Sequence, residues 1–373
     1  MSSLTIQSVD TVIVDLPTRR PHKFKSVTMD YQSYVIARVR TADGIEGIGE
    51  STTPGGPWWG GESVETIKAT IDTYLAPELI GQQASRIDLL LERMDRIAAD
   101  NQFAKACVEM ALFDAWGKAL GVPVHDLLGG LFRESIPVTW ALSADDADIV
   151  IGEAEEKLTA EGHRSFKLKA GAQRPEEDVS RILSVAKALG DRASVRVDFN
   201  AAWDANTAAR WLPKLESGGI DLIEQPIPGW NIEAMGRLAA QLTIPIMADE
   251  SVRSVQDAYT VCRYAAGDIF SLKVNKLGGL SRTKKTAAVA ESMGIPCHGG
   301  TSIESSIGTA AAAHVYGALP NVTFGSELFG PKLLADDLTE ESLVYDKGEL
   351  QVPDGPGLGV RLDEVKLAEY RRS

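Results

Sequence analysis

Cysteine is scarce in this sequence of 373 residues, and long apolar runs are missing. The three cysteines are Cys107, Cys262 and Cys297, and none forms a CxxC pair. An odd, widely spaced set argues against a disulfide framework and indicates a reduced protein. No apolar run approaches the length of a membrane span, and the first residues, MSSLTIQSVD, lack the pattern of a signal peptide. We therefore expect a cytoplasmic protein.

Basic residues are outnumbered by acidic ones. The chain has 38 Lys and Arg against 52 Asp and Glu, which gives a net charge of −14. A negative surface repels phosphate backbones and anionic lipids, so we expect no nucleic-acid and no membrane partner. It also fails to attract an anionic substrate from a distance. An anion would need a local site made of a metal ion, lysines or backbone N–H groups.

From residue 136 onward, short apolar runs alternate with amphipathic stretches. Helical patterns such as residues 147–163, 176–190 and 281–294 separate the runs. Such alternation is typical of a parallel sheet, and eight units predict an α/β fold with a (β/α)8-type barrel. An open, doubly wound sheet is the alternative, but no glycine-rich nucleotide motif follows the first strands. The predicted strands are residues 136–142, 165–169, 194–199, 220–224, 244–249, 269–274, 295–299 and 322–327.

The first part of the chain has a different pattern. Strand-like segments come first, and helices are predicted at residues 63–77, 85–98 and 102–120. We therefore predict an N-terminal α+β domain over residues 1–130 and the barrel over residues 131–330. The C-terminal segment, residues 331–373, leaves the barrel rhythm, and we expect it to return to the first domain.

Acidic residues end three successive barrel strands. Asp198, Glu224, Asp249 and then Lys273 follow one another at intervals of 26, 25 and 24 residues. Each interval is one strand–helix unit, so the four side chains share the carboxyl-terminal mouth of the barrel. Two carboxylates about 5 Å apart repel by roughly 3 kcal/mol at an effective dielectric near 20. A divalent cation reverses this repulsion, and hard oxygen ligands suit Mg²⁺ or Mn²⁺.

These motifs resemble those of a known family. The stretches KLK, DFN, IEQP, ADES and KVNK, together with GGTSIESSIG and FGSELFGP, are similar to the muconate-lactonising branch of the enolase superfamily. Most of the chain takes part in this resemblance. It implies an N-terminal capping domain, a catalytic barrel and a divalent metal, Mn²⁺ or Mg²⁺, held by Asp198, Glu224 and Asp249. A lysine base near a divalent cation is the chemistry used in such sites.

The resemblance also implies roles for other residues. Two lysines, Lys167 and Lys169, lie two apart on one strand and so face the same side. Lys169 is the expected proton-transfer group, and Lys167 is expected to lower its pKa and to contact a substrate carboxylate. Lys273 is expected to serve as a second acid/base or as a cation contact, and Glu327 is an expected catalytic glutamate.

Substrate contacts are predicted less directly. Two loops of the capping domain, residues 17–25 and 52–62, would supply them. His298 is interpreted as a buried barrel histidine. The predicted substrate-binding residues are Asn200, Glu250, Thr301, Ser302, Trp59 and His22, with Glu250 interpreted as a partner of a lysine.

By resemblance, the expected reaction is cycloisomerisation of cis,cis-muconate, a dicarboxylate, to muconolactone through an enediolate, in aromatic degradation. The alternatives are a chloromuconate cycloisomerase and an N-acylamino acid racemase or o-succinylbenzoate synthase. The stretch SELFGP speaks against a dipeptide epimerase, which is expected to carry Asp-x-Asp there. A non-catalytic relative is disfavoured because the lysines and carboxylates are all present. The resemblance also implies a homo-oligomer, with an octamer as one form.

Overall fold

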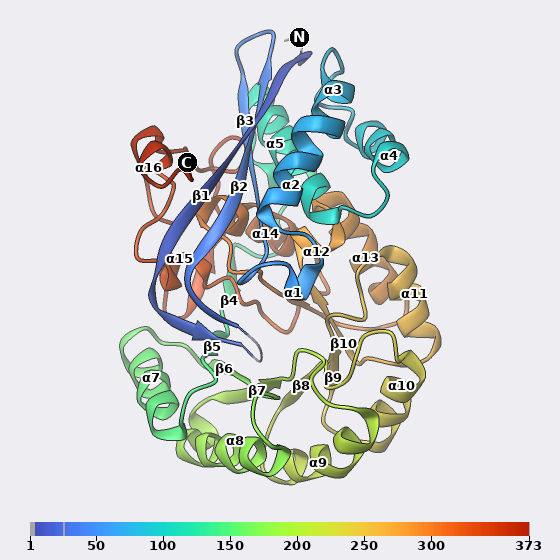
Figure 1. The fold of residues 1–373 in the computed structure, drawn as a ribbon, viewed down its shortest axis with the longest axis vertical. Helices are drawn as coiled ribbons and strands as arrows, with labels where there is room; N and C mark the ends of the chain where they lie inside the picture. Colours follow the sequence, from blue (N-terminus) through green and yellow to red (C-terminus); the bar gives the residue numbers. More distant parts are fainter. Residues whose placement is uncertain (1–3, 25–26, 373) are drawn as a thin grey trace.

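A three-stranded antiparallel sheet and a group of helices form the N-terminal part of the molecule (Figure 1). The computed structural model describes residues 4–24 and 27–372. The sheet has the order β1 (Ile6–Lys23), β2 (Thr28–Thr41) and β3 (Glu46–Thr52). The first two strands make a long ribbon whose far end reaches the barrel near β5 and β6 (Figure 1). This end carries residues 17–24 of the segment 17–25 that the sequence suggested as a loop. Strand β1 runs on to Lys23, and Lys25 lies outside the described residues.

Helix α5 (Gln102–Leu120) packs on this sheet. Its sequence is apolar nearly all round, as expected of a helix buried on most sides. Two glycines of β3 permit the close approach. A Cβ at Gly47 would lie 2.0 Å from the Ala111 carbonyl oxygen, and one at Gly49 would lie 2.0 Å from that of Cys107. The shorter helices around α5 are α1 (Pro57–Gly60), α2 (Val64–Thr70), α3 (Ala76–Leu79), α4 (Ile87–Ile97) and α6 (Val124–Leu127), with a π-helical turn (Ile71–Leu75) between α2 and α3.

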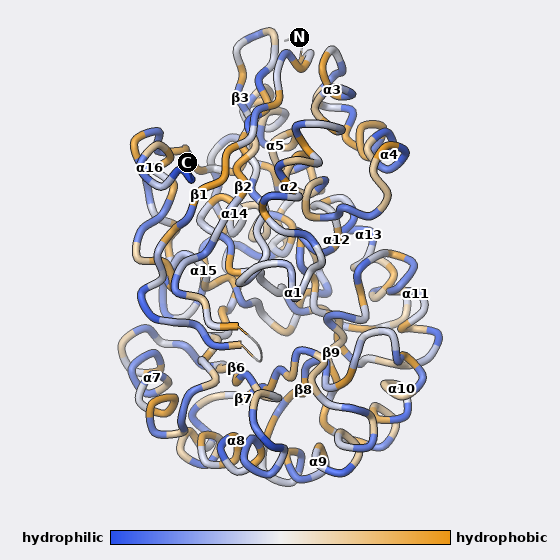
Figure 2. Tube along the Cα trace, viewed as in Figure 1, coloured by the Kyte–Doolittle hydropathy of each residue, from blue (hydrophilic) through white to orange (hydrophobic). Residues whose placement is uncertain are grey.

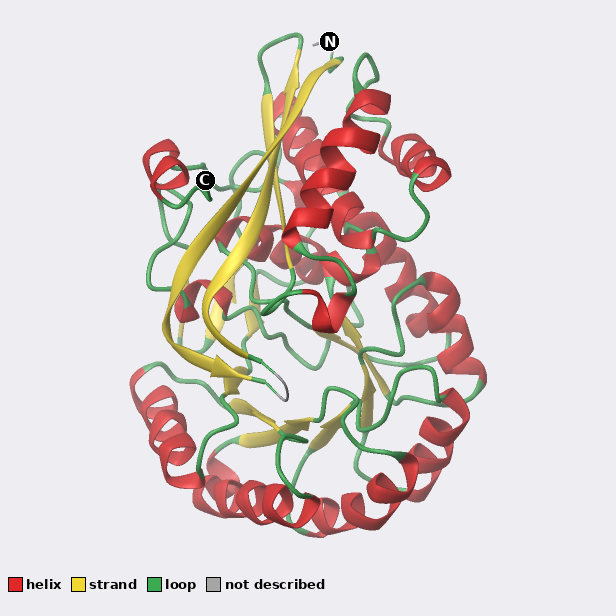
Figure 3. Ribbon diagram, viewed as in Figure 1, coloured by secondary structure: helices red, strands yellow, loops and turns green. Residues whose placement is uncertain are grey.

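Seven parallel strands follow in sequential order around the barrel. Figure 3 shows them inside an arc of helices, and Figure 2 shows that these helices carry both hydrophilic and hydrophobic residues. The strands are β5 (Trp140–Leu142), β6 (Ser165–Lys169), β7 (Ser194–Asp198), β8 (Leu222–Glu224), β9 (Ile246–Ala248), β10 (Ile269–Leu272) and β11 (Cys297–Gly299). The main helices are α7 (Ala147–Ala160), α8 (Pro175–Leu189), α9 (Ala205–Ser217), α10 (Ile232–Gln241), α11 (Val255–Arg263), α13 (Leu280–Ser292) and α14 (Ser306–Ala318).

The first and the eighth predicted strands differ from expectation. Residues 136–142 divide into β5 and the preceding β4 (Ser135–Pro137), which pairs with β13 (Glu349–Gln351) in a small outer sheet with β12 (Tyr345–Asp346). Residues 322–327 form no regular strand. Ser326 alone bridges to Gly299 on one side and to Val138 on the other. The ring is therefore closed by single bridges, at which the Ser326 N–H donates to the Pro137 carbonyl oxygen and the Glu327 N–H to that of Gly299, each over 2.7 Å.

The C-terminal segment lies against the N-terminal sheet. Leu334 bridges to Thr18, and Arg371 bridges to Val14. The segment begins within α15 (Gly330–Leu333) and includes α16 (Glu364–Glu369). The domain boundaries near residues 130 and 330 stay a prediction. In the part of the chain that the structure describes, no helix combines the length and the apolar character needed to cross a bilayer.

Candidate active site

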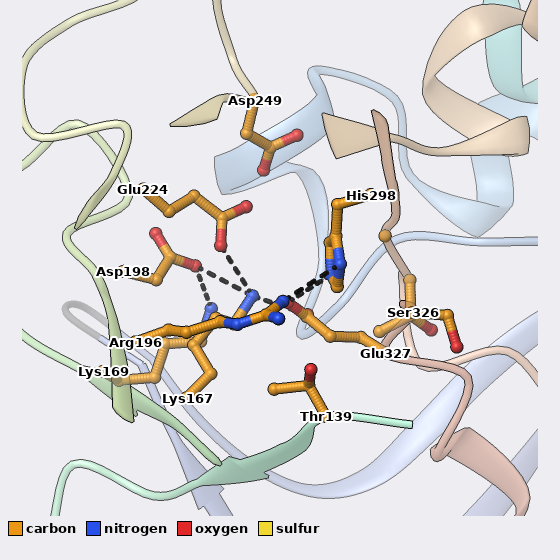
Figure 4. Close-up of polar contacts among 12 residues, drawn as sticks. Thr139, Lys167, Lys169, Arg196, Asp198, Glu224, Asp249, His298, Ser326 and Glu327 are labelled. Atoms are coloured by element: carbon orange, nitrogen blue, oxygen red, sulfur yellow. Dashed lines mark hydrogen bonds and ion pairs between the residues drawn. The ribbon is translucent and has the colours of Figure 1, made fainter. Parts of the chain in front are cut away.

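Three carboxylates and a lysine stand at the carboxyl ends of four neighbouring strands, where the regular intervals placed them (Figure 4 shows the carboxylates). Asp198 ends β7, Glu224 ends β8, and Asp249 follows β9 directly. All three are fully buried. Lys273 follows β10 and precedes the short helix α12 (Val274–Leu277). The parallel pairing of Lys169 with Asp198 and of Asp198 with Glu224 holds neighbouring side chains at one level of the barrel.

Both lysines of β6 are bound to these carboxylates. The Lys167 Nζ lies 2.9 Å from Glu224 Oε2, 2.5 Å from Glu327 Oε2 and 3.5 Å from Asp198 Oδ2. The Lys169 Nζ lies 2.5 Å from Asp198 Oδ2 and donates to the Asn200 side-chain oxygen over 3.0 Å. The two ammonium groups therefore share Asp198, as their common face on the strand requires.

Asp249 is held by lysines from the other side of the barrel. Lys273 donates to its Oδ2 over 2.6 Å, and Lys276 donates to its Oδ1 over 2.7 Å. Lys276 is a site residue that the sequence reading missed. It also donates to the Asp249 and Ser271 carbonyl oxygens, so it ties the strand end to α12. The motif KVNK was the available signal, since its second lysine is three residues after the first.

Charge sets the protonation of these groups. Burial would lower the pKa of Lys167, but Glu224, Glu327 and Asp198 raise it well above its usual range. Burial raises the pKa of Glu224 to about 8, with Asp198 adding to the rise and Lys167 opposing it. The pKa of Asp249 shifts in the opposite direction. Burial would raise its pKa, but its two lysines hold it well below the usual range. The carboxylate with fewest cations nearby is therefore Glu224.

The donors present fit a divalent cation. Among the described residues, no three acidic, histidine or cysteine side chains already stand in a ligating arrangement. Lysine ammonium groups lie between the carboxylates instead. Glu224 Oε1 is buried and has no hydrogen-bond partner within the described part of the chain, which is costly unless a cation completes it. Three carboxylates at neighbouring strand ends supply the hard oxygen donors that such an ion prefers.

The capping domain covers the site with aromatic rings. The Trp59 indole N–H donates to Glu250 Oε1 over 2.9 Å, and the Lys273 Nζ lies 4.2 Å from the centre of the Trp59 ring. Asn200 donates to the same Glu250 oxygen over 3.1 Å. Among the described residues Glu250 forms no ion pair with a lysine, so the expected pairing is not made: Oε1 accepts from Trp59 and Asn200, and Oε2 is buried without a hydrogen-bond partner.

A second ring covers the other lysine. The Lys169 Nζ lies 5.4 Å from the centre of Phe24, and Phe24 contacts the rings of His22 and Trp58. His22 is buried, and its Nε2 has no partner among the described residues. Burial, Arg20 and Lys169 lower its pKa well below the usual value, so it is neutral.

The space between the cover and the strand ends is small. The cavity measures about 30 Å³, lined by both β6 lysines, Lys273, Glu327 and the covering rings. This volume holds one or two waters, so a six-carbon ligand requires the lysine side chains to move. A larger groove of about 950 Å³ lies against the C-terminal segment, and its lining contains none of the lysines and carboxylates described above.

Thr301 and Ser302 differ from the sequence interpretation. Their donors were expected to hold a substrate carboxylate. The Ser302 backbone N–H instead donates to Glu304, 3.0 Å from Oε1 and 2.9 Å from Oε2, and the Thr301 hydroxyl donates to Glu304 as well. An internal carboxylate thus takes the Thr301 hydroxyl and the Ser302 N–H, while the Ser302 hydroxyl is buried without a hydrogen-bond partner among the described residues and Thr301 still lines the cavity. Tyr34 of β2 holds the same loop by donating to the Ile303 carbonyl oxygen over 2.9 Å.

His298 is buried and hydrogen-bonded, as predicted. Its Nε2 lies 3.1 Å from Glu327 Oε1, and its Nδ1 lies near the Phe324 carbonyl oxygen and Arg196. Arg196 had no predicted role. It precedes Asp198 by two residues on β7, so it points the same way but lies deeper in the barrel.

Two family models match the chain. One describes the mandelate racemase / muconate lactonizing enzyme N-terminal domain and covers residues 8–129. The other describes an enolase C-terminal domain-like fold and covers residues 150–366.

Similar proteins extend over the full length. The chain is 47% identical to muconate cycloisomerase 1 of Rhodococcus opacus, over all of both chains. The crystal structure of a muconate lactonizing enzyme from Pseudomonas fluorescens, complexed with muconolactone, has a TM-score of 0.98 at 48% identity and covers 100% of both chains. The crystal structure of 2-chloromuconate cycloisomerase from Rhodococcus opacus 1CP has a TM-score of 0.97 at 50% identity and covers 99% of this chain and 100% of that one.

Proposed function

The chain belongs to the mandelate racemase / muconate lactonizing enzyme family of the enolase superfamily, and we propose that it cycloisomerises cis,cis-muconate to muconolactone. Members of the superfamily use a divalent metal. We propose that this reaction is a step in the degradation of aromatic compounds.

One observation carries the proposal. Lys169 on β6 and Lys273 after β10 line one cavity from well-separated strands, and the carboxylates of the three intervening strands lie between them. Lysines on two sides of a bound substrate can place a proton donor on either face of a planar carbon. The carboxylates between them point to a cation that offsets the charge of a dicarboxylate.

Asp198, Glu224 and Asp249 would hold this cation, and we propose Mn²⁺ or Mg²⁺. When bound, it would stabilise the negative charge that develops on a substrate carboxylate. The lysines that bridge the carboxylates in this structure would then turn toward the substrate. Lys169 and Lys273 have this freedom, since each borders the cavity.

The chemistry assigned to the chain is one proton transfer. One substrate carboxylate oxygen adds to the far carbon of the conjugated double bond, and the displaced electron pair produces the enediolate of the other carboxylate. Lys169 Nζ then gives a proton to the α-carbon and regains one from water. The dianion thereby becomes a lactone monoanion, with one proton taken up per turnover. Lys169 is suited to this step because its Nζ contacts Asp198 and Asn200 and borders the cavity.

The other residues orient the substrate and exclude water. We propose that Lys167 and Lys273 face the developing negative charge. His22, with an unpartnered Nε2, is placed to donate to the distal carboxylate. Trp59 and Phe24 keep water from the reacting carbon.

A chlorinated substrate is a second candidate. The 2-chloromuconate cycloisomerase is as similar to this chain as the muconate enzymes are, at 50% identity against 48%. Comparing kcat/KM for cis,cis-muconate and 2-chloromuconate decides between them.

The test is an assay of the purified protein loaded with Mn²⁺. Loss of the diene absorbance of cis,cis-muconate, with muconolactone as product and one deuterium at its α-carbon in D₂O, is the expected result. A folded, metal-loaded protein that leaves muconate intact would overturn the proposal. Exchange of the α-proton of N-succinyl amino acids would then be measured, to test the racemase alternative.

Two further expectations belong to the proposal. We expect a cytoplasmic homo-oligomer, with an octamer as one form. Light scattering after size exclusion gives the mass of the assembly, and a monomer would contradict this expectation.

A further inference from the structure

A buried chain of polar groups runs from the barrel interior to the floor of the site. Arg196, His298, Glu327 and Lys167 follow one another at hydrogen-bond distance (Figure 4). The proposed reaction uses only the upper end of this chain. The lower end consists of a buried guanidinium and a buried imidazole, which are expensive to place inside a barrel without a purpose.

The distances determine which groups donate. Arg196 Nη1 lies 3.2 Å from His298 Nδ1 and 3.0 Å from the Phe324 carbonyl oxygen. Its two protons can serve one acceptor each. An Arg nitrogen cannot accept, so a hydrogen bond in this contact uses the lone pair of His298 Nδ1, which also lies 3.0 Å from the Phe324 carbonyl oxygen.

The other ring nitrogen then carries the proton. His298 Nε2 lies 3.1 Å from Glu327 Oε1, a carboxylate oxygen that accepts. A proton on Nδ1 could instead donate to the Phe324 carbonyl oxygen, 3.0 Å away, but it would stand beside the Arg196 N–H groups and would leave the Nε2 lone pair against the carboxylate. A fully protonated ring would place a second cation beside Arg196. Burial lowers the pKa of His298, and Arg196 acts in the same direction. The neutral Nε2–H form satisfies the contacts with Arg196 and Glu327, and the Phe324 carbonyl oxygen then accepts from Arg196 Nη1 alone.

Glu327 is consequently held at both oxygens. His298 donates to Oε1, and Lys167 donates to Oε2 over 2.5 Å. The Glu327 backbone N–H donates to the Gly299 carbonyl oxygen over 2.7 Å, which fixes the backbone but leaves the side-chain torsions of Glu327 open. The direction of its carboxylate therefore depends on side-chain partners.

We infer that Arg196 and His298 are positioning residues: Arg196 fixes the Nε2–H tautomer of His298, which orients Glu327 and thereby places Lys167 against the reacting anion. This inference is based on the proposed cycloisomerase function. Lys167 faces the negative charge that develops in the transition state. A displaced Lys167 ammonium group therefore lowers kcat more than it changes KM.

Two variants of similar volume separate positioning from packing. In His298→Gln the side-chain amide reaches the place of Nε2 and can still donate to Glu327. In His298→Met the volume is kept and the donor is lost. We expect H298Q to stay within about 3-fold of the parent kcat and H298M to fall about 10- to 100-fold, the usual cost of losing such a partner, with KM changed less than about 3-fold. Equal kcat values in the two variants would overturn the inference.

A measurement without turnover completes the test. Solid-state NMR of the full-length protein, with ¹⁵N in its histidine rings, reports which nitrogen of each ring is protonated, and H298Q identifies the His298 signals by their loss. We expect a proton on Nε2 alone in the parent and a shift toward Nδ1 in Arg196→Met. A parent protonated on Nδ1, or on both nitrogens, would overturn the inference even if the enzyme turns over muconate. If the parent leaves muconate intact but shows the expected tautomer, the function fails and the hydrogen-bond order stands.

Discussion

The floor and the roof of the site are built on different principles. The floor consists of strand ends of the barrel, where each lysine contacts at least one carboxylate at a defined distance. The roof consists of capping-domain segments that present Phe24, Trp58, Trp59 and His22. The floor is fixed by hydrogen-bonded strands of the barrel, whereas the roof is carried by the end of the β1–β2 ribbon and by the short helix α1. We infer from this difference that the floor determines the reaction and that the roof determines which substrate binds.

The largest expected effect is on the floor as a whole. Dialysis against a chelator removes the divalent cation and leaves three buried carboxylates without it. We expect turnover to fall below detection and to return on adding Mn²⁺ or Mg²⁺. Activity measured while the ion is added back in known amounts gives the affinity of the protein for that ion. A metal-free protein that keeps its activity would contradict the assignment of Asp198, Glu224 and Asp249.

Removing one lysine of the floor comes next. In Lys169→Met the proton donor is lost, and we expect kcat to fall by roughly 10³- to 10⁴-fold, in the upper half of the range for a general acid–base group. Circular dichroism checks the fold. The matched control is Lys187→Met on the exposed side of α8, which should leave kcat unchanged. Comparable loss in both variants would remove the role from Lys169.

The roof should respond more weakly and in a different parameter. In Trp59→Ala the ring over Lys273 and the N–H donor to Glu250 are both lost. A cation–π contact is worth about 0.5–2 kcal/mol, so we expect KM to rise about 3- to 30-fold with a smaller change in kcat.

Trp59→Phe separates the two contributions, because it keeps a ring and loses the donor. Trp230→Ala is the control, since Trp230 is 82% exposed. If Trp59→Ala lowered kcat as much as the loss of Lys169 does, the division between floor and roof would be wrong.

The smallest expected effect is on stability, and it comes from the contact between Glu50 and Ser305 that connects the N-terminal sheet to the barrel. Glu50 of β3 accepts from the Ser305 backbone N–H over 2.9 Å, and burial raises its pKa to about 8. Its ordinary value is 4.5. Its contribution to the free energy of unfolding is therefore present below about pH 4.5 and is lost as the pH rises through 8.

Urea unfolding at pH 5.5 and pH 8.5 measures this contribution. We expect the parent to lose on the order of 3 kcal/mol relative to Glu50→Gln between these pH values, since each pKa unit is worth about 1.4 kcal/mol. Parallel pH dependence in the two proteins would show that Glu50 keeps an ordinary pKa.

Much of the floor could be predicted because strand and helix repeat at a fixed interval. Asp198, Glu224 and Asp249 end successive apolar runs, and equivalent positions in a barrel lie at one mouth. The same reading failed at residues 322–327, where one bridging residue replaces a strand, and at residues 136–142, which serve two sheets. Apolar runs of these lengths look alike, and only the partners available nearby decide their pairing.

The sequence by itself determined the barrel, the capping domain and the set of lysines and carboxylates, because hydrophobic periodicity and strand-end position are local properties of the chain. Only the tertiary structure decided which donor meets which acceptor. Glu304 accepts from the Thr301 hydroxyl and the Ser302 backbone N–H, Glu250 accepts from Trp59, 191 residues away, and Arg196 contacts His298 across 102 residues. Such contacts depend on side chains from distant segments competing for one oxygen or nitrogen, and this competition is settled only when the whole chain is packed.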